Sequence, residues 1–217
     1  MAAILNDRLL LFTPGTGSTA LEVYLKVHAH IFIPNFTFVP DDRLQRHIAL
    51  ADVETLLNRK FDVCISSTRN PVNYYFSEWY RMRTKWAKEL DKPDSWIHQS
   101  RTKEFTLKAM EMNFEDWIID HFSDLSIDKQ LHVGPHYKGS TKFLRCENLC
   151  EDFRSALSEI YNKPLELFPI LRIVNSSNIP PSLYHSECSA AALEAIIPRF
   201  LDYNTACGYS NTVSDYL

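Results

Sequence analysis

The chain has 217 residues, a formal net charge of −4, 45% hydrophobic residues and a mean hydropathy of −0.23. This length suits one domain, residues 1–217, with a central sheet and helices on both faces. The acidic balance argues against nucleic acid or an anionic membrane as partner, and no apolar run reaches the ~20 residues of a membrane-spanning helix.

The first residues lack a secretory pattern, because the polar Asn6-Asp7-Arg8 interrupts the only apolar stretch there. Five cysteines without framework spacing favour a reducing compartment over a disulfide scaffold. We therefore expect a soluble, cytoplasmic protein, and a bacterial or viral source is compatible with this expectation. The oligomeric state cannot be read from the sequence.

The first apolar run, residues 8–13, ends at Pro14-Gly15 and is typical of a buried strand. Apolar residues then recur at helical spacing from Ser18 onward. Either Ser18 or Thr19 would serve as the N-cap of this helix. The sequence therefore predicts a strand, a glycine-containing turn and a helix in succession.

Further strands and helices alternate beyond this point. Residues 31–39 are rich in β formers but contain one proline and end before another, so an edge strand is expected. A two-turn helix is expected over 52–58 and a buried strand over 61–67. Pro71 suits the first position of a helix that continues to about Leu90, because the missing N–H of proline is not needed there.

The second half of the chain begins with a polar, irregular stretch, residues 91–140, around one expected helix over 102–120. We interpret this stretch as a mostly helical lid or substrate-facing insertion. A third strand is expected over 142–146, followed by helices over 148–161 and 187–201. Strands that alternate with helices indicate a three-layer α/β/α fold with a mainly parallel sheet.

A glycine-rich turn, Thr13-Pro-Gly-Thr-Gly-Ser-Thr-Ala-Leu21, has the features of an anion-binding loop. Its glycines allow a tight turn, and the N–H groups of the first helical turn would face an anion at the positive end of the helix. The same pattern also occurs in plain connectors, and it lacks the Gly-Lys-Ser/Thr of ATP- and GTP-binding P-loops. The residues expected to bind the anion are Gly15, Thr16, Gly17, Ser18, Thr19 and Ala20.

A second phosphate signal follows the strand expected over 61–67. Arg69, at the end of this strand, can form a forked pair of bonds to a phosphate. Ser77 lies two turns into the next helix and could donate to the same phosphate. An arginine here could also be simply exposed or part of an ion pair. The two segments together predict two anion pockets, for a nucleotide phosphorylated at both ends.

These segments resemble a known family. Arg69-Asn-Pro-Val-Asn-Tyr-Tyr-Phe-Ser77 is similar to the 3′-phosphate motif of the sulfotransferases, in which Arg-Asn/Asp-Pro is followed by serine at the eighth position. The turn before the first helix resembles the 5′-phosphosulfate loop of the same family. Further similarity lies in His47-Ile-Ala-Leu-Ala-Asp52, in Phe143-Leu-Arg-Cys-Glu-Asn-Leu-Cys-Glu-Asp-Phe153, and in Asp202-Tyr203 with Gly208-Tyr209, which is similar to the ending of carbohydrate-type members.

The resemblance implies a P-loop nucleoside-kinase-like fold and 3′-phosphoadenosine 5′-phosphosulfate (PAPS) as co-substrate, without a metal. It implies in-line transfer of a sulfuryl group to a hydroxyl or amine of a carbohydrate or small-molecule acceptor. His47 is the expected general base, because histidine titrates near neutral pH and the family places a histidine shortly before the 3′-phosphate strand. A solvated loop histidine is the alternative interpretation of His47.

The chain departs from the family at one position. Family members usually carry lysine or arginine directly after the loop proline, whereas this chain has Gly15. Loss of such a cation costs on the order of 3 kcal/mol of transition-state stabilisation. Three explanations are open: Lys138 or Lys142 occupies the position of the missing cation, the loop donors and the helix dipole suffice for slow turnover, or the protein binds the nucleotide without catalysing transfer. A degenerate binding protein and a small-molecule kinase of the same fold therefore remain as alternatives.

Overall fold

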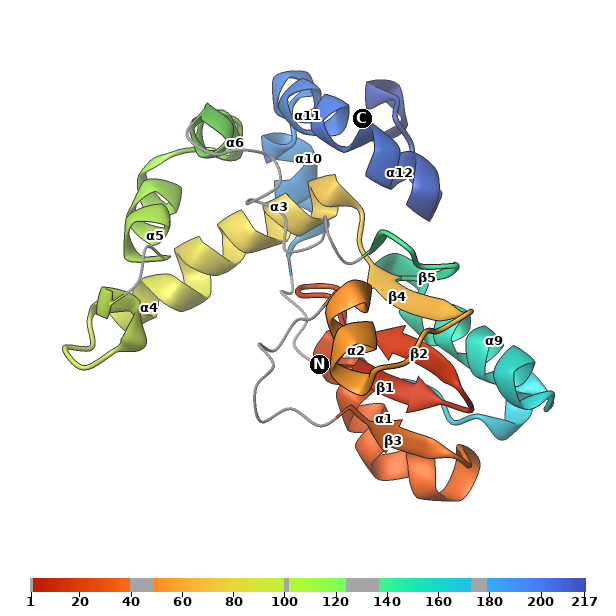
Figure 1. Cartoon of the computed structure of the whole chain (residues 1–217). Coiled ribbons are helices and arrows are strands. Elements are labelled where there is room, and N and C mark those ends of the chain that lie inside the picture. The colour runs from red at the N-terminus through yellow and green to blue at the C-terminus, as the bar shows by residue number, and fades with distance from the viewer. Residues whose placement is uncertain (1, 40–48, 100–101, 124–136, 173–178) are drawn as a thin grey trace. The chain divides into compact units, whose positions relative to one another are not determined.

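The computed structural model describes residues 2–39, 49–99, 102–123, 137–172 and 179–217 (Figure 1). The chain divides into two compact units, Met1–Asn70 with Leu131–Ser176 and Pro71–Gln130 with Ser177–Leu217. Each unit is described by itself below. The expectation of a single domain, and of a lid over 91–140, stays a prediction.

The first unit contains a five-stranded sheet in the order β3-β1-β2-β4-β5. Strands β2, β4 and β5 are parallel, whereas β1 runs antiparallel to both β2 and β3. The fold is therefore α/β with a mixed sheet, in which β1 runs opposite to the other four strands, so the expectation of a mainly parallel sheet is confirmed in part. The strands are β1 (Ala2–Leu5), β2 (Arg8–Leu11), β3 (Phe36–Phe38), β4 (Cys64–Thr68) and β5 (Lys142–Arg145).

A hairpin at the start of the chain explains the antiparallel strand. Asn6 and Asp7 both adopt left-handed backbone angles, with φ of 44° and 68°. Two successive residues with positive φ form the tight turn whose twist matches two antiparallel strands. The pair therefore joins β1 to β2, with Leu5 opposite Arg8, instead of interrupting a single apolar stretch.

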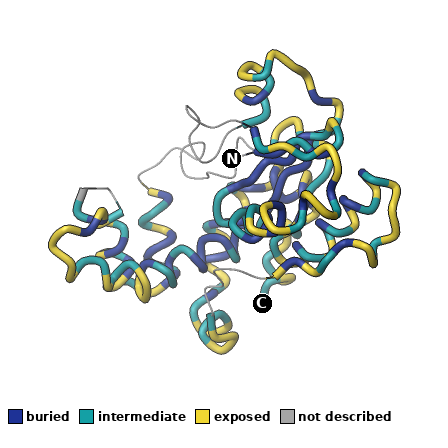
Figure 2. The backbone as a smooth tube through the Cα atoms, turned by 90° about the horizontal axis from the view of Figure 1, so that it is seen from below, coloured by how far each residue is buried: buried dark blue, intermediate teal, exposed yellow. Residues whose placement is uncertain are grey.

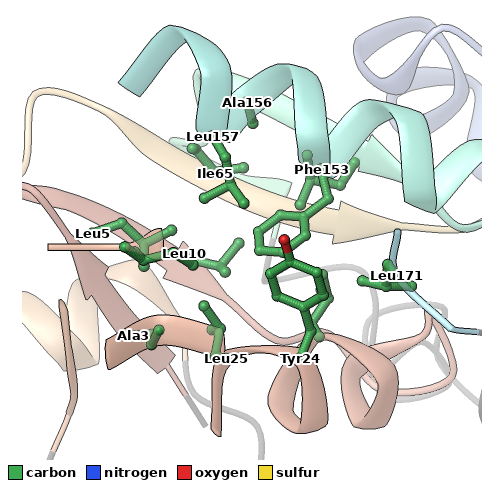
Figure 3. Packing of buried hydrophobic residues seen from close by; sticks show 14 of the residues in the cluster. Ala3, Leu5, Leu10, Tyr24, Leu25, Ile65, Phe153, Ala156, Leu157 and Leu171 are labelled. Carbon is green, nitrogen blue, oxygen red and sulfur yellow. The ribbon is translucent and has the colours of Figure 1, made fainter. Parts of the chain in front are cut away.

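Helices cover both faces of this sheet (Figure 1). Leu10 of β2 packs on one face with α1 (Ser18–Phe32) and α9 (Leu149–Tyr161), whereas Leu9 and Leu11 pack on the other face with α2 (Leu50–Leu57). Successive side chains of a strand point to opposite faces, which explains this division. Figure 3 shows Tyr24 of α1 facing Phe153 of α9, with ring centroids 5.3 Å apart.

Strands β2 and β4 form the buried centre of the unit, and β5 lies beside β4 at the edge of the sheet. All five residues of β4 are buried, as are the three leucines of β2 (Figure 2). The chain leaves β2 through residues 12–17, leaves β4 through Arg69-Asn70, and leaves β5 through the short helix η3 (Cys146–Asn148). Because the three strands are parallel and adjacent, these exits lie at the same edge of the sheet.

All the regular secondary structure described in the second unit is helical. Its aromatic core includes Phe76, Trp79 and Phe114, whose ring centroids lie 4.8 to 5.7 Å apart. The structure describes no helix that is both long and apolar enough to cross a bilayer. The elements are α3 (Pro71–Arg81), the π-helix η1 (Met82–Trp86), α4 (Ala87–Leu90), η2 (Trp96–Gln99), α5 (Thr102–Glu111), α6 (Phe114–Ser123), α10 (Pro181–Glu187), α11 (Ala190–Ile196), η5 (Ile197–Phe200), α12 (Leu201–Cys207) and η6 (Val213–Asp215).

Two expected helices of this unit are divided. The stretch 102–120 contains α5 and α6, because Asn113 accepts a hydrogen bond from the Asp116 N–H (2.8 Å) and caps a new helix. The stretch 187–201 is divided near Pro198, which lacks the N–H that a continuous helix requires. The expected helix start at Pro71 is confirmed, and so is an edge strand within 31–39. This strand is shorter than expected: β3 covers 36–38, and residues 31 and 32 belong to α1.

Candidate functional site

The loop between β2 and α1 ends on two glycines in the left-handed region. Gly15 has a φ of 69° and Gly17 a φ of 83°. Gly17 is the N-cap of α1, so the expected cap at Ser18 or Thr19 was wrong; both are already helical. The backbone N–H groups of Ala20 and Leu21 donate to the Gly17 carbonyl, at 2.9 and 3.2 Å.

This geometry leaves donors at the positive end of α1. The helix's own hydrogen bonding starts with the Ala20 N–H, so the amides of Gly17, Ser18 and Thr19 have no acceptor within the helix. They lie where the helix dipole favours negative charge. Ala20 itself is buried in the core and its amide is bonded, so its expected ligand contact finds no support in the geometry.

Gly17 is also required for space. A β-carbon built on Gly17 would lie 2.3 Å from Cδ2 of Leu149, the first residue of α9. This distance is far shorter than any ordinary van der Waals contact. The close approach brings the start of α9 against the loop, and the left-handed φ at the same residue independently favours glycine.

A buried hydroxyl network holds the loop to the neighbouring strand. Ser67 of β4 accepts a hydrogen bond from the Thr13 N–H (3.1 Å), and its Oγ lies 2.6 Å from Thr16 Oγ1. Because Thr16 Oγ1 donates to the Thr13 carbonyl (2.7 Å), Ser67 must donate its own proton to Thr16. The structure thus uses the Thr16 hydroxyl inside the protein, whereas the sequence suggested a donor to the ligand.

The Thr13 hydroxyl differs from these groups. It is buried, and the described part of the chain provides no hydrogen-bond partner for its Oγ1. Buried hydroxyls are normally bonded, so such an atom needs an explanation.

Arg69 meets the same loop from the end of β4. Its Nη1 donates to the Gly15 carbonyl at 3.1 Å. The guanidinium also acts on Cys146 of η3: burial raises the pKa of that thiol, and the positive charge of Arg69 lowers it. The arginine predicted from the second motif therefore lies at the glycine loop predicted from the first.

The segment after β5 is hydrogen-bonded to the segment after β4. Glu147 of η3 accepts a hydrogen bond from the backbone N–H of Asn70 through Oε1, at 3.0 Å. The turn after β5 is thereby fixed to the turn after β4. Together with the bonds of Ser67 and Arg69, this contact joins the segments that follow β2, β4 and β5 by hydrogen bonds.

Two lysines suggested as substitutes for the family cation lie elsewhere. Lys142 is the first residue of β5 and forms an ion pair with Glu159. Its strand neighbour is Ile65, whereas the far end of β5, Arg145, pairs with Thr68 beside the site. Lys138 precedes Lys142 in the chain, in a turn tied to the beginning of β4 through Thr141. Neither lysine therefore lies at the edge that carries the loop.

The described structure does not test where the remaining predicted residues lie relative to this edge. His47 lies outside the described residues. Ser77 is buried in α3 of the second unit, so its place relative to the loop stays a prediction. His28 and His30 lie on α1, where residues two apart do not face each other. No group of three or more potential metal ligands occurs among the described residues.

Comparisons of the chain with protein-family models, with curated proteins and with solved structures found no match. What the site can do must therefore follow from its own groups. The first-turn amides and the Arg69 guanidinium are all donors, and the guanidinium is permanently charged. Such a set binds a multiply charged oxyanion, such as a phosphate or a phosphosulfate.

Proposed function

We propose that this protein is a PAPS-dependent sulfotransferase with a P-loop nucleoside-kinase-like first unit. It transfers a sulfuryl group to a hydroxyl or amine of a carbohydrate or small-molecule acceptor. The observation that carries the proposal is the 3.1 Å hydrogen bond from Arg69 to Gly15. This bond brings together two segments, 54 residues apart in sequence, that we propose to bind the phosphates of a bisphosphorylated nucleotide.

The parallel part of the sheet supports the proposed fold. Strands β2, β4 and β5 each run into a turn at their carboxyl ends, and nucleotides in open α/β sheets bind outside these ends. The glycine loop follows the central strand β2, where its first-turn amides can hold the 5′ group. Strands β1 and β3, which pair antiparallel to each other, lie on the side of β2 away from Arg69 and do not disturb this arrangement.

The proposed mechanism is an in-line displacement. The acceptor oxygen or nitrogen attacks sulfur while the bond from sulfur to the 5′-phosphate oxygen breaks, and the electron pair of that bond leaves with the phosphate. His47 takes the proton of the acceptor. Because the transition state is loose, positioning and charge stabilisation supply most of the rate. The products are the sulfated acceptor and adenosine 3′,5′-bisphosphate, whose 3′-phosphate Ser77 would help to hold.

A catalytically degenerate nucleotide-binding protein is the second candidate. It is favoured by Gly15, which stands where the family carries a cation, and by the positions of Lys138 and Lys142 away from the loop. Such a protein would retain the amides and Arg69 for binding but would stabilise the leaving phosphate poorly.

Calorimetry and radiolabelled transfer separate these candidates. We expect adenosine 3′,5′-bisphosphate to bind with micromolar affinity, and labelled sulfate to pass from PAPS to a member of a panel of sugars, phenols and amines. Binding without transfer to any acceptor would favour the degenerate protein. Absence of heat with the bisphosphate would refute both.

A histidine pair tests the proposed base. His47→Ala should abolish transfer and leave the affinity for adenosine 3′,5′-bisphosphate nearly unchanged, since the imidazole acts on the acceptor. His30, exposed in the last turn of α1, provides the matched control, and His30→Ala should retain both properties. Equal turnover in the two variants would remove His47 from the mechanism.

A further inference from the structure

The loop has no lysine or arginine after Pro14, and its backbone explains why. Gly15 occupies this position with a φ of 69°, a conformation that residues with a side chain rarely adopt. A lysine at this position would therefore require a differently shaped loop. A positive charge beside the bound anion would then come from another element of the chain.

Three basic residues of β5 and its preceding turn do not provide this charge. Lys138 and Lys142 lie toward the amino ends of the strands, as described above. Arg145 ends β5 at the correct edge, but its Nε is 3.2 Å from Asp152 Oδ2, which also accepts its backbone N–H at 2.9 Å. The guanidinium that contacts the loop is that of Arg69.

The contact places Arg69 next to the donors of the first helical turn. Gly15 and Gly17 are separated by one residue, so their Cα atoms lie at most about 7 Å apart. An anion held by the first-turn amides and the guanidinium bonded to the Gly15 carbonyl therefore contact the same short loop. A guanidinium carries five N–H donors, so its bond to Gly15 is compatible with further bonds to an oxyanion.

We propose that Arg69 supplies the cation that the loop lacks and that its guanidinium binds the 5′ group of the nucleotide. This inference rests on the proposed function and changes the role that the sequence motif assigned to Arg69, which was the 3′-phosphate. During transfer, negative charge develops on the 5′-phosphate oxygen as its bond to sulfur breaks, and a preorganised guanidinium stabilises that charge.

Mononucleotides distinguish the two roles. Adenosine 5′-monophosphate, adenosine 3′-monophosphate and adenosine 3′,5′-bisphosphate are titrated calorimetrically into the wild-type chain and into Arg69→Ala, Arg69→Lys and Lys142→Ala. We expect Arg69→Ala to weaken the 5′-monophosphate by about tenfold or more, as for the loss of a charge-assisted bond. Arg69→Lys should retain part of the affinity, and Lys142→Ala should retain all of it.

The outcomes separate this inference from the function on which it rests. If Arg69→Ala weakens only the 3′-monophosphate, Arg69 is a 3′ anchor and the inference is wrong, while the proposed function survives. If none of the three nucleotides binds to the wild-type chain, the proposed function fails and this inference fails with it. Thermal unfolding checks the folding of each variant, and Arg69→Lys carries the test if Arg69→Ala does not fold.

Discussion

Replacing Gly17 with alanine is expected to destabilise the protein more than the same replacement at Gly208. Both glycines have left-handed backbone angles, with φ of 83° and 74°. They differ in their surroundings: a β-carbon on Gly17 would meet Leu149 Cδ2 at 2.3 Å, whereas one on Gly208 would meet nothing within 4 Å. Gly208, the C-cap of α12, therefore serves as a control that carries the backbone cost alone.

The magnitudes follow from these two terms. The left-handed conformation costs a residue with a side chain about 1–2 kcal/mol, and this cost applies at both positions. Gly17→Ala also forces the buried Leu149 to move, and overpacking of this kind typically costs about 1–3 kcal/mol. We therefore expect losses of unfolding free energy of about 2–5 kcal/mol for Gly17→Ala and about 1–2 kcal/mol for Gly208→Ala.

Urea denaturation followed by circular dichroism measures both losses. The steric term can be isolated with Leu149→Ala, because the added methyl group occupies space that the shortened side chain vacates. The double variant Gly17→Ala/Leu149→Ala should therefore lose less free energy than the sum of the single variants. Equal losses for Gly17→Ala and Gly208→Ala, or strict additivity with Leu149→Ala, would show that α9 does not press against the loop.

Three further predictions concern buried or tied polar groups. Ser67→Ala removes the acceptor of a buried loop amide and the partner of the Thr16 hydroxyl, so the free energy of unfolding should fall by about 1–3 kcal/mol; an unchanged urea midpoint would contradict the network. Burial lowers the pKa of His121 from 6.5 to about 4. Between these pH values the unfolded chain binds a proton at His121 that the folded chain does not. The free energy of unfolding should therefore fall as pH decreases from 6.5 toward 4. An imidazole NMR titration midpoint near 6.5 in the folded protein would refute this, and His121→Phe should flatten the pH dependence. Glu147→Gln keeps an acceptor for the Asn70 N–H but removes a negative charge beside the site. Adenosine 3′,5′-bisphosphate should therefore bind about two- to fivefold tighter at low salt, and calorimetry would detect this change.

The local pattern of the chain predicted the elements that carry the site. The apolar runs before Pro14 and Arg69 are strands because such runs, bounded by turn residues, suit the buried centre of a sheet. The helix after Gly17 follows equally from its apolar spacing. Once the two strands are neighbours and parallel, the meeting of the glycine loop and Arg69 at one edge is a geometric consequence.

Other features depend on contacts that a local pattern does not encode. Asn6-Asp7 was interpreted as a polar interruption, although both residue types tolerate the left-handed conformation that a hairpin needs. Ser67 was counted within a buried strand, but its bonds to Thr13 and Thr16 join residues more than 50 positions apart. The N-cap was misassigned for a similar reason: Leu149 approaches from another helix and would have to move if position 17 carried a side chain.

The same long-range bonds bear on the proposed role of Arg69. A lysine in a phosphate loop must order a flexible four-carbon side chain when the anion binds, at a cost in rotamer entropy. Arg69 is already fixed against the Gly15 carbonyl, and the turn that carries it is bonded through Asn70 to Glu147. Part of that ordering cost is therefore met when the chain folds, which favours a cation that approaches from the neighbouring strand. In this proposal, the positive charge that a loop lysine would supply after β2 is supplied by Arg69 after β4. The Gly15 carbonyl, in a residue with a left-handed backbone, is the hydrogen-bond partner of the Arg69 guanidinium.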